Sequence, residues 1–232
     1  MGRLCWADGR DVIVRVVLPM LVLWGLIVGF GLAVVGPLAG PLNAEDAINR
    51  GLAVHRSGAG DSVTFVWSFL GSTQAIAGVC LVVSAAVLWH TRDWRLAIVP
   101  GMAVLLQLSM YLTVTALIHR ERPSVERLEA LPPMSSYPSG HVGASVALYL
   151  SLILLASRCR RAGVRWVMTA MCGIIPLLVA SSRVYLGVHH VSDVVVGMVG
   201  GAGCALLAYR WYLHRVRAGT TPSGAEPPDS ER

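Results

Sequence analysis

The sequence contains no lysine, so all of its basic side chains other than histidine are arginines. Charged residues of either sign are scarce as well: they make up 14% of the 232 residues, whereas 55% of the residues are hydrophobic. Soluble domains usually carry about 25% charged residues. This shortage of charge argues against an ordinary soluble domain and favours an integral membrane protein.

Patterns for disulfides and bound metals are also missing. The five cysteines are odd in number and scattered, and no CxxC pair or cysteine–histidine spacing typical of a zinc site occurs. We therefore predict neither a disulfide framework nor a metal site, and no cofactor is indicated.

Six apolar stretches approach the length of about 20 residues that a helix needs to cross a bilayer. The predicted spans are residues 12–36, 66–90, 96–118, 141–157, 165–182 and 191–212, of which the fourth and fifth are short. The sequence thus predicts an all-α, polytopic membrane protein with a six-transmembrane-helix bundle. The first stretch could instead be a signal peptide, but its apolar run is longer than such a peptide requires.

The predicted bundle occupies residues 12–216 and leaves a short segment at each end. Residues 1–11 would form a cytoplasmic N-terminus. Residues 217–232 are rich in proline, glycine and serine and are predicted to be a disordered cytoplasmic tail.

The arginines are distributed unevenly over the loops. If both termini are cytoplasmic, 13 arginines lie on the cytoplasmic side and 6 on the outer side, and the most basic loop is SRCRRAGVR at 157–165. The positive-inside rule supports this orientation. It also accounts for the net charge of +6 without a nucleic-acid partner.

The outer loop 37–65 is predicted to contain a short amphipathic helix. Asn43 would be its N-cap, and Glu45 and Asp46 would lie in its first turn.

Ionisable residues gather at the outer ends of spans three to six. They come from separate stretches of sequence: Arg122, His141, Arg183, His189 and Asp193. Ionisable residues at a membrane are costly and are taken as functional by default. Two arginines, two histidines and a helix N-terminus provide charge stabilisation, a nucleophile and a proton donor, which is what phosphoryl transfer without a metal requires.

The stretch YPSGH places Ser139 at a helix N-cap, with Gly140 and His141 opening the helix. A helix N-terminus attracts anions through its unpaired N–H groups and its dipole, and glycine lets an anion approach the backbone closely. Histidine can exchange a proton beside that anion. Taken alone, however, this stretch is more typical of a turn and a helix cap.

The stretch SRVYLGVHHVSD places His189 and Asp193 four residues apart, on one face of a helix. A carboxylate bonded to one imidazole nitrogen would leave the other nitrogen as base or nucleophile. Arg183 can present a planar fork to phosphate oxygens. An interfacial His–Asp pair with a snorkelling arginine is an equally good interpretation of this stretch alone.

The three stretches together resemble the signature of the type 2 phosphatidic acid phosphatase superfamily: K-x6-R-P, P-S-G-H and S-R-x5-H-x3-D. The second and third motifs are complete, at residues 138–141 and 182–193. The first, at 115–123, keeps Arg122 and Pro123 but has Thr115 where the family has lysine. The six apolar stretches extend the resemblance to most of the chain.

The resemblance implies a metal-independent phosphatase of lipid phosphates or diphosphates. His189 would attack phosphorus and form a phosphohistidine, Asp193 would orient His189, and His141 would protonate the leaving group. The phosphate oxygens would be bound by basic groups and a helix N-terminus, namely Arg122, Arg183, Ser139 and the Gly140 amide.

The lysine that the family carries at position 115 is missing from this site. On a continuous helix Thr115, His119 and Arg122 would share a face, so one cation is lost from that stripe. We hypothesise that Arg120 replaces it as a phosphate ligand, because a guanidinium is permanently charged. His119 is the alternative.

The expected protein is a multi-pass cell-membrane phosphatase whose active site faces the extracytoplasmic side. Its substrate would belong to the class of phosphatidic acid, phosphatidylglycerol phosphate and polyprenyl diphosphate. Two alternatives stay open, a lipid-linked phosphotransferase that uses the same site and a non-catalytic membrane protein that binds anionic lipid. The sequence indicates neither the oligomeric state nor the physiological substrate.

Overall fold

The computed structural model describes residues 13–42, 44–130 and 134–219, and all regular elements within them are helices. In chain order these are the π-helix η1 (Ile13–Val17) and the α-helices α2 (Leu18–Val35), α3 (Ala39–Leu42), α4 (Glu45–Val54), α5 (Gly58–Leu70), α6 (Thr73–Thr91), α7 (Trp94–Ala97), α8 (Val99–Leu117), α9 (Gly140–Ala156), α10 (Ala162–Tyr185) and α11 (Val191–Gly219). The predicted N-terminal segment 1–11, the predicted N-cap Asn43 and the tail beyond 219 lie outside the described residues.

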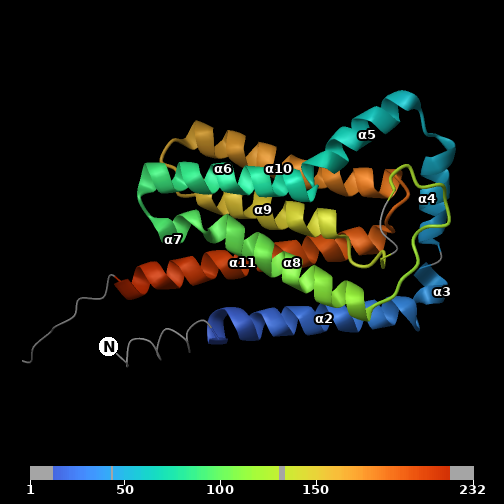
Figure 1. Ribbon diagram of the computed structural model, residues 1–232, viewed down its shortest axis with the longest axis horizontal. Helices are drawn as coiled ribbons and strands as arrows, with labels where there is room; N and C mark the ends of the chain where they lie inside the picture. Colours follow the sequence, from blue (N-terminus) through green and yellow to red (C-terminus); the bar gives the residue numbers. More distant parts are fainter. Residues whose placement is uncertain (1–12, 43, 131–133, 220–232) are drawn as a thin grey trace, which may run out of the picture.

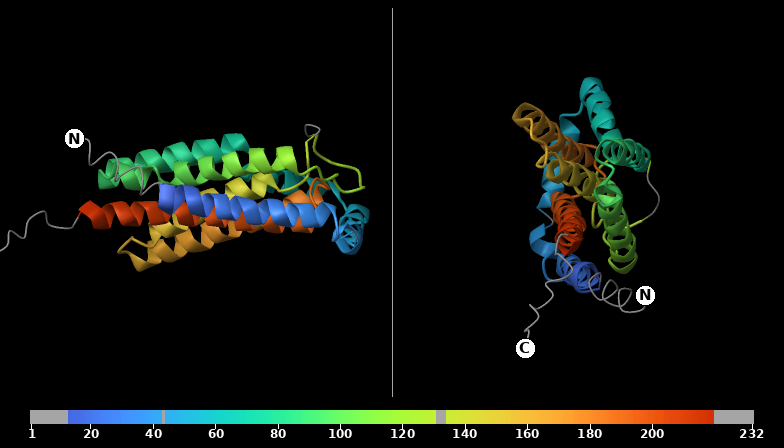
Figure 2. Two further views of the ribbon diagram at one scale, coloured as in Figure 1. Left: turned by 90° about the horizontal axis from the view of Figure 1, so that it is seen from below. Right: turned by 90° about the vertical axis from the view of Figure 1, so that its left-hand side faces the viewer.

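The long helices run lengthwise in an elongated bundle, with α9 and α11 at its centre (Figures 1 and 2). Helix α9 contacts α8, α10 and α11, and α11 also contacts α2 and α8. Glycines on α11 permit this close approach: a Cβ at Gly197 would lie 2.7 Å from the carbonyl oxygen of Ser139, and Gly201 packs against Gly143 of α9. The central helix pair therefore depends on residues without side chains.

Helix α2 is held to the bundle by polar contacts as well as by packing. The Tyr137 hydroxyl donates to the backbone oxygen of Ile27 over 2.7 Å, and Trp24 Nε1 donates to Thr113 Oγ1 over 2.9 Å. Helix α2 is thus bonded both to the loop before α9 and to α8.

Five of the predicted spans are helices long and apolar enough to cross a membrane: Ile13–Val35, Thr73–Thr91, Trp94–Leu117, Ala162–Tyr185 and Val191–Arg217. The predicted fourth span corresponds to α9, an apolar helix of 17 residues, about 26 Å long at 1.5 Å per residue. Large apolar side chains such as Leu26, Leu81 and Leu105 are 67%, 72% and 64% exposed on the outside of the bundle. The chain is thus a multi-pass membrane protein whose apolar surface suits lipid.

Some of the predicted boundaries are wrong. The second span begins at Thr73 rather than residue 66, because the chain breaks at Gly71 and Ser72 then caps α6 by accepting a hydrogen bond from the Ala75 amide. The residues before the break belong to α5, which packs against α10 and diverges from α6 (Figure 1). Helix α10 extends beyond the predicted 165–182 at both ends, and α11 continues into the predicted tail as far as Gly219.

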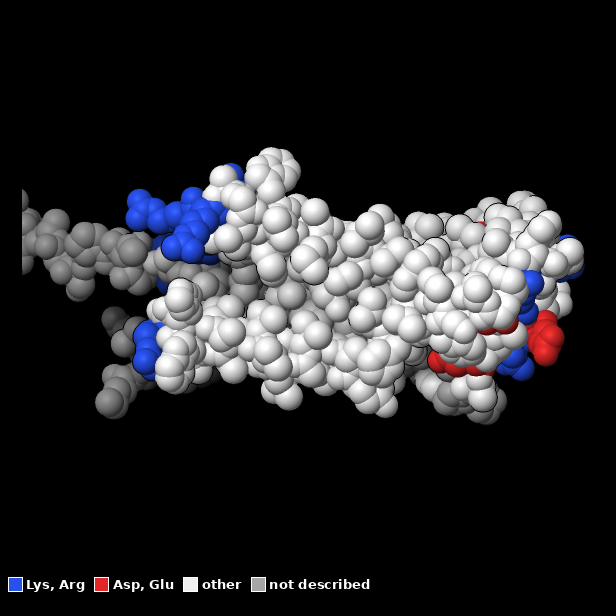
Figure 3. Space-filling view, turned by 90° about the horizontal axis from the view of Figure 1, so that it is seen from above, with Lys and Arg blue, Asp and Glu red and all other residues white. Residues whose placement is uncertain are grey.

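Charged side chains gather at the two ends of the bundle and leave an apolar middle (Figure 3). The arginine-rich end comprises residues 91–98, 157–165 and 210–217. The mixed-charge end comprises α3, α4, the loop 118–139, the start of α9 and the turn from α10 to α11, and it carries acidic as well as basic side chains. All of the predicted site residues belong to the mixed-charge end.

Candidate active site

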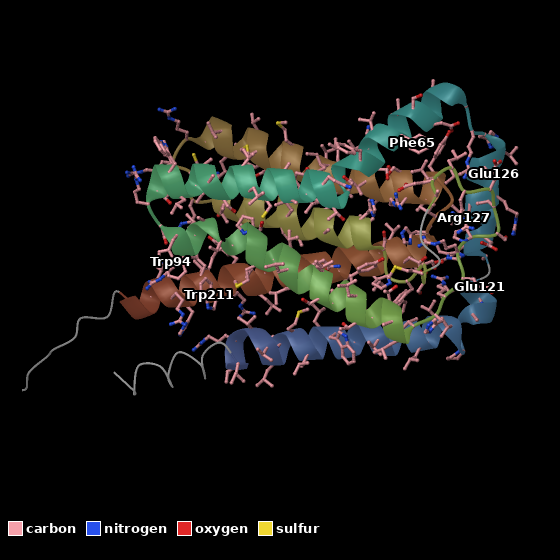
Figure 4. The ribbon with its side chains drawn as sticks, in the orientation of Figure 1. Phe65, Trp94, Glu121, Glu126, Arg127 and Trp211 are labelled. Carbon is pink, nitrogen blue, oxygen red and sulfur yellow. The ribbon has the colours of Figure 1, made fainter. Side chains whose placement is uncertain are left out.

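The three signature stretches come together at the mixed-charge end of the bundle. Arg122 lies in the loop after α8, His141 in the first turn of α9, Arg183 near the end of α10 and His189 in the turn before α11. Arg183, His189 and Arg122 all lie close enough to His141 for their charges to act on its ring. In Figure 4 the loop that carries Arg122 is marked by the labels of Glu121, Glu126 and Arg127. The helices therefore bring distant arginines and histidines into one cluster.

His189 is buried and held by a backbone carbonyl. Its Nδ1 lies 2.7 Å from the backbone oxygen of Ser136 and 3.9 Å from Asp193 Oδ2. Since a carbonyl oxygen can only accept, Nδ1 carries the proton and Nε2 keeps its lone pair. Burial lowers the pKa of His189, and the positive charge of Arg183 acts in the same direction. The neutral, nucleophilic form of the ring is therefore favoured.

Asp193 does not make the direct hydrogen bond to His189 that its spacing suggested. Its Oδ2 accepts from the His190 amide over 2.9 Å and lies 3.3 Å from His190 Nδ1, and its Oδ1 accepts from Arg120 over 2.5 Å. The reason is that α11 begins only at Val191, so both histidines precede the helix and Asp193 sits in its first turn. Asp193 thus acts on His189 through its charge and through the turn rather than through a direct bond.

Arg120 lies between two carboxylates. Its Nη2 is 3.1 Å from Glu45 Oε2, and its Nη1 donates to Ser192 Oγ and to Asp193. Its side chain is 11% exposed. This geometry conflicts with our hypothesis that Arg120 replaces the missing lysine as a phosphate ligand, because its charge is already compensated. The contacts favour a role in positioning Asp193.

The expected helical stripe from Thr115 to Arg122 is not formed, because α8 ends at Leu117. Beyond this point the backbone of Arg120 pairs with the later part of the same loop: its amide donates to Ser135 Oγ, and its carbonyl accepts from the Ser136 amide. Thr115 itself is buried on α8, and its hydroxyl has no hydrogen-bond partner.

Three of the predicted phosphate ligands have buried polar atoms without a hydrogen-bond partner. These atoms are Nε of Arg122, Nε of Arg183 and Oγ of Ser139. Ser139 occupies the N-cap position of α9, as expected, yet its hydroxyl makes no capping bond. Gly140 follows as the first residue of the helix, where a Cβ would lie 2.9 Å from the ring of Tyr111. Buried polar groups are nearly always satisfied, and these three atoms can donate to a ligand that accepts hydrogen bonds.

Arg183 is fully buried and has partners that the sequence did not indicate. Its Nη1 donates to Ser68 Oγ of α5 over 2.6 Å and to Glu129 Oε2 of the loop over 2.5 Å. Neither residue belongs to a recognisable motif, and Glu129 is 54 positions away along the chain. Only the mixed charge of the loop 119–140 could have suggested an internal ion pair.

Helix α4 supports the turn that carries His189. Asn49 is buried and donates from Nδ2 to the backbone oxygens of Val184 and His189, over 3.1 and 3.2 Å. Arg56, just after the helix, donates to the backbone oxygens of Tyr185 and Glu126. The amphipathic helix was predicted, and the structure begins it at Glu45 with Ala44 at the N-cap position. Its polar face fixes the backbone around the site.

The fold and the site together define a class: a helical membrane protein with a cluster of arginines and histidines at one end of its bundle. The sequence model of the PAP2 superfamily matches residues 53–217. The chain therefore belongs to the PAP2 superfamily, as its three motifs suggested.

Two solved structures share this fold. A transmembrane PAP2-type phosphatidylglycerolphosphate phosphatase from Bacillus subtilis is 20% identical, with a TM-score of 0.74 over 84% of this chain and 96% of the other. LpxE from Aquifex aeolicus is 20% identical, with a TM-score of 0.56 over 71% of this chain and 93% of the other. At this identity the likeness concerns the fold. No curated protein sequence matches the chain.

Proposed function

We propose that the protein is an integral membrane phosphatase that hydrolyses a lipid phosphate or diphosphate through a phosphohistidine intermediate. The observation that carries this proposal is the set of unpartnered donors on Arg122, Arg183 and Ser139, buried beside two histidines. A phosphoryl group would satisfy these donors, and the two guanidinium groups would balance its charge.

His189 is the nucleophile in this proposal. With its proton held at Nδ1 by the Ser136 carbonyl, Nε2 attacks phosphorus. The new N–P bond forms as the bond from phosphorus to the lipid oxygen breaks. The ring becomes positively charged, and this charge is stabilised by the Ser136 carbonyl and by the Asp193 carboxylate 3.9 Å away.

His141 is the proton donor in this proposal. In its protonated form it gives a proton to the departing lipid oxygen, which leaves as an alcohol. The neutral ring then takes a proton from water as that water attacks the phosphohistidine, so the P–N bond breaks and inorganic phosphate is released. The cycle returns both histidines to their starting states and requires no metal ion.

A lipid substrate is supported by the surroundings of the site. An apolar groove of about 470 Å³ runs between α2 and α11 and is lined by residues such as Leu26, Phe30 and Val195. Glu45 and Ser192, which bond Arg120, line its polar part. A hydrocarbon chain in this groove would place its polar end at the level of the site. The positive-inside rule supports an extracytoplasmic location for the same end.

The test is phosphate release from phosphatidic acid, phosphatidylglycerol phosphate and polyprenyl diphosphate by the purified protein in detergent with EDTA present. We expect turnover with at least one of them, and a loss of about 10⁴-fold or more in His189→Gln. His141→Asn should lose about 10²- to 10⁴-fold. His55→Gln is the matched control, because His55 is exposed at the same end and its Nδ1 bonds the Gly51 carbonyl.

The outcomes separate the alternatives. Lipid binding that survives His189→Gln, with no phosphate release by the wild type, would identify a non-catalytic lipid-binding protein. Loss of activity with EDTA would contradict the metal-free mechanism. Transfer of the phosphoryl group to an added alcohol in preference to water would identify a phosphotransferase.

A further inference from the structure

The ion pair between Arg183 and Glu129 joins a signature residue to a residue outside the signature. The Arg183 side chain is 1% exposed, whereas that of Glu129 is 25% exposed. Ser68 Oγ also lies 3.4 Å from Glu129 Oε2, so the serine, the arginine and the carboxylate form one small network. A carboxylate therefore lies at the arginine that is expected to bind phosphate.

A buried guanidinium requires a counter-ion in the free protein. Leaving such a charge unpaired is strongly destabilising. The other charged and titratable neighbours of Arg183 are Arg122, His141 and His189, none of which can supply a negative charge, and Tyr111. Asp193 is bonded to Arg120 and His190 instead. Glu129 is thus the carboxylate that compensates Arg183 when no ligand is bound.

A bound phosphate would supply the same compensation with more negative charge. The Nε atom of Arg183 has no partner and is available to the phosphate, while Nη1 is bonded to Glu129. A phosphate dianion at this guanidinium would meet a like charge at close range, and like charges at one site oppose each other. Glu129 and a bound phosphate would therefore both be stabilised by the single positive charge of Arg183.

We propose that Glu129 is the resident counter-ion of Arg183 and limits the affinity of the site for phosphate by competing for this guanidinium. The inference rests on the proposed function, since it assigns Arg183 to phosphate binding. The competition by Glu129 has a specific consequence, because inorganic phosphate, the product, then binds weakly and leaves the site. A lipid phosphate gains additional binding energy from its apolar part and tolerates the competition.

The test compares Glu129→Gln with Glu126→Gln in the purified full-length protein. Glu126 lies in the same loop and is exposed, and the contact it makes with Arg56 uses its backbone oxygen. Thermal unfolding is followed with and without orthovanadate, an analogue of phosphate, and the dissociation constant of vanadate is measured directly.

Glu129→Gln should lower the melting temperature without vanadate, because Arg183 loses its counter-ion. It should also bind vanadate about tenfold more tightly than the wild type and show a larger stabilisation by it. A purely structural role would lower stability without tightening vanadate binding. Glu126→Gln should change neither quantity.

A shorter carboxylate provides a second variant in case Glu129→Gln does not fold. Glu129→Asp keeps the charge but withdraws it from Arg183, so its vanadate affinity should lie between those of the wild type and Glu129→Gln. Vanadate binding that is unchanged or weaker in the variants would overturn the proposal.

Failure of this inference and failure of the proposed function give different results. Vanadate binding is measured without turnover. Tighter binding by Glu129→Gln in a protein that releases no phosphate would leave the competition standing and reject the phosphatase. Turnover in the wild type without tighter vanadate binding in the variant would reject only the competition.

Discussion

The two ends of the bundle use the same residue type in opposite ways. At the arginine-rich end, arginines lie over aromatic rings: the exposed Arg158 over Tyr212 at 5.3 Å, and the half-buried Arg95 over Trp94 at 5.7 Å. At the mixed-charge end, the half-buried Arg120 and the buried Arg183 are bonded to carboxylates. Figure 4 places Trp94 and Trp211 at the first end and Glu121 and Glu126 at the second.

This difference follows from where the acidic residues lie. Asp93 is the single carboxylate that the described residues contribute to the arginine-rich end, and it caps α7 and accepts from Tyr212. Every other described carboxylate lies at the mixed-charge end or in the adjoining helices α5 and α11. Arginines in the short loops of one membrane face orient a chain in the membrane. Arginines with acidic partners can be buried and can hold a site in place.

Among the substitutions that test this difference between the two ends, Arg120→Ala should have the largest effect. The substitution leaves Glu45 and Asp193 facing each other without a cation, so unfolding should become easier by about 3–5 kcal/mol. Displacement of Asp193 and the His189 turn should lower kcat about 100-fold. Denaturant unfolding in detergent and initial rates measure the two effects.

Arg50→Ala is the matched control for this variant. Arg50 is 56% exposed and pairs with Asp46 at 3.7 Å on the surface of the same end. The substitution should cost at most about 1 kcal/mol and leave kcat unchanged. Vanadate affinity tests the assigned role: a positioning residue leaves it nearly unchanged in Arg120→Ala. A large loss of vanadate affinity would instead support our first hypothesis, that Arg120 is a phosphate ligand.

The sequence alone allowed the backbone of the site to be predicted better than its contacts. The starts of α9 at Gly140 and of α11 near His189 were expected, because glycine, serine and aspartate at helix N-termini are local signals. The break at Gly71 was missed, because the apolar run continues on both sides of it and hydropathy averages over such a break.

The partners of the site residues had no comparable signal. The acceptor of His189 is the backbone oxygen of Ser136, and a carbonyl is present at every residue, so no residue type indicates it. Glu129 and Arg183 are 54 positions apart in the sequence, and Glu129 lies in an irregular loop. No periodic pattern of the sequence therefore relates the two residues. The spacing of His189 and Asp193 suggested a direct bond, but that spacing rule applies within a helix, and His189 precedes α11.

The pH dependence of turnover sharpens the comparison, because the proposed nucleophile His189 lies at the mixed-charge end. Burial lowers the pKa of His189 below its ordinary value of 6.5, so the ring stays neutral at a pH where an exposed histidine is protonated. On the acidic side of the pH profile, kcat/KM decreases when His189 becomes protonated. The midpoint of this decrease should therefore lie below pH 6.5. The charge of Asp193 raises the pKa of His189, so Asp193→Asn should move this midpoint to still lower pH.

The measurement is a pH profile of kcat/KM for both proteins with one substrate, so that titration of the substrate phosphate is common to both. A midpoint that moves to higher pH in Asp193→Asn would contradict the electrostatic role of the carboxylate. An unmoved midpoint would mean that His189 is not the group whose protonation stops the reaction.

The smallest effect is expected at the arginine-rich end. Arg158 is exposed and lies over Tyr212, so Arg158→Gln should cost at most about 1 kcal/mol of stability and leave kcat and KM unchanged. Rates and unfolding are measured as for Arg120→Ala. A tenfold loss of kcat would show that the two ends are coupled and that the comparison drawn above is wrong.

The same end also provides the test of orientation, because Cys159 lies beside Arg158 in the basic loop. A membrane-impermeant maleimide applied to intact cells should leave a protein with Cys159 as its single cysteine unlabelled. It should label a protein whose single cysteine is introduced by Glu126→Cys at the opposite end. Because the arginines of this end lie far from the candidate site, their contribution should appear in this labelling pattern rather than in turnover. Labelling of Cys159 from outside would reverse the proposed orientation and place the histidines on the cytoplasmic face.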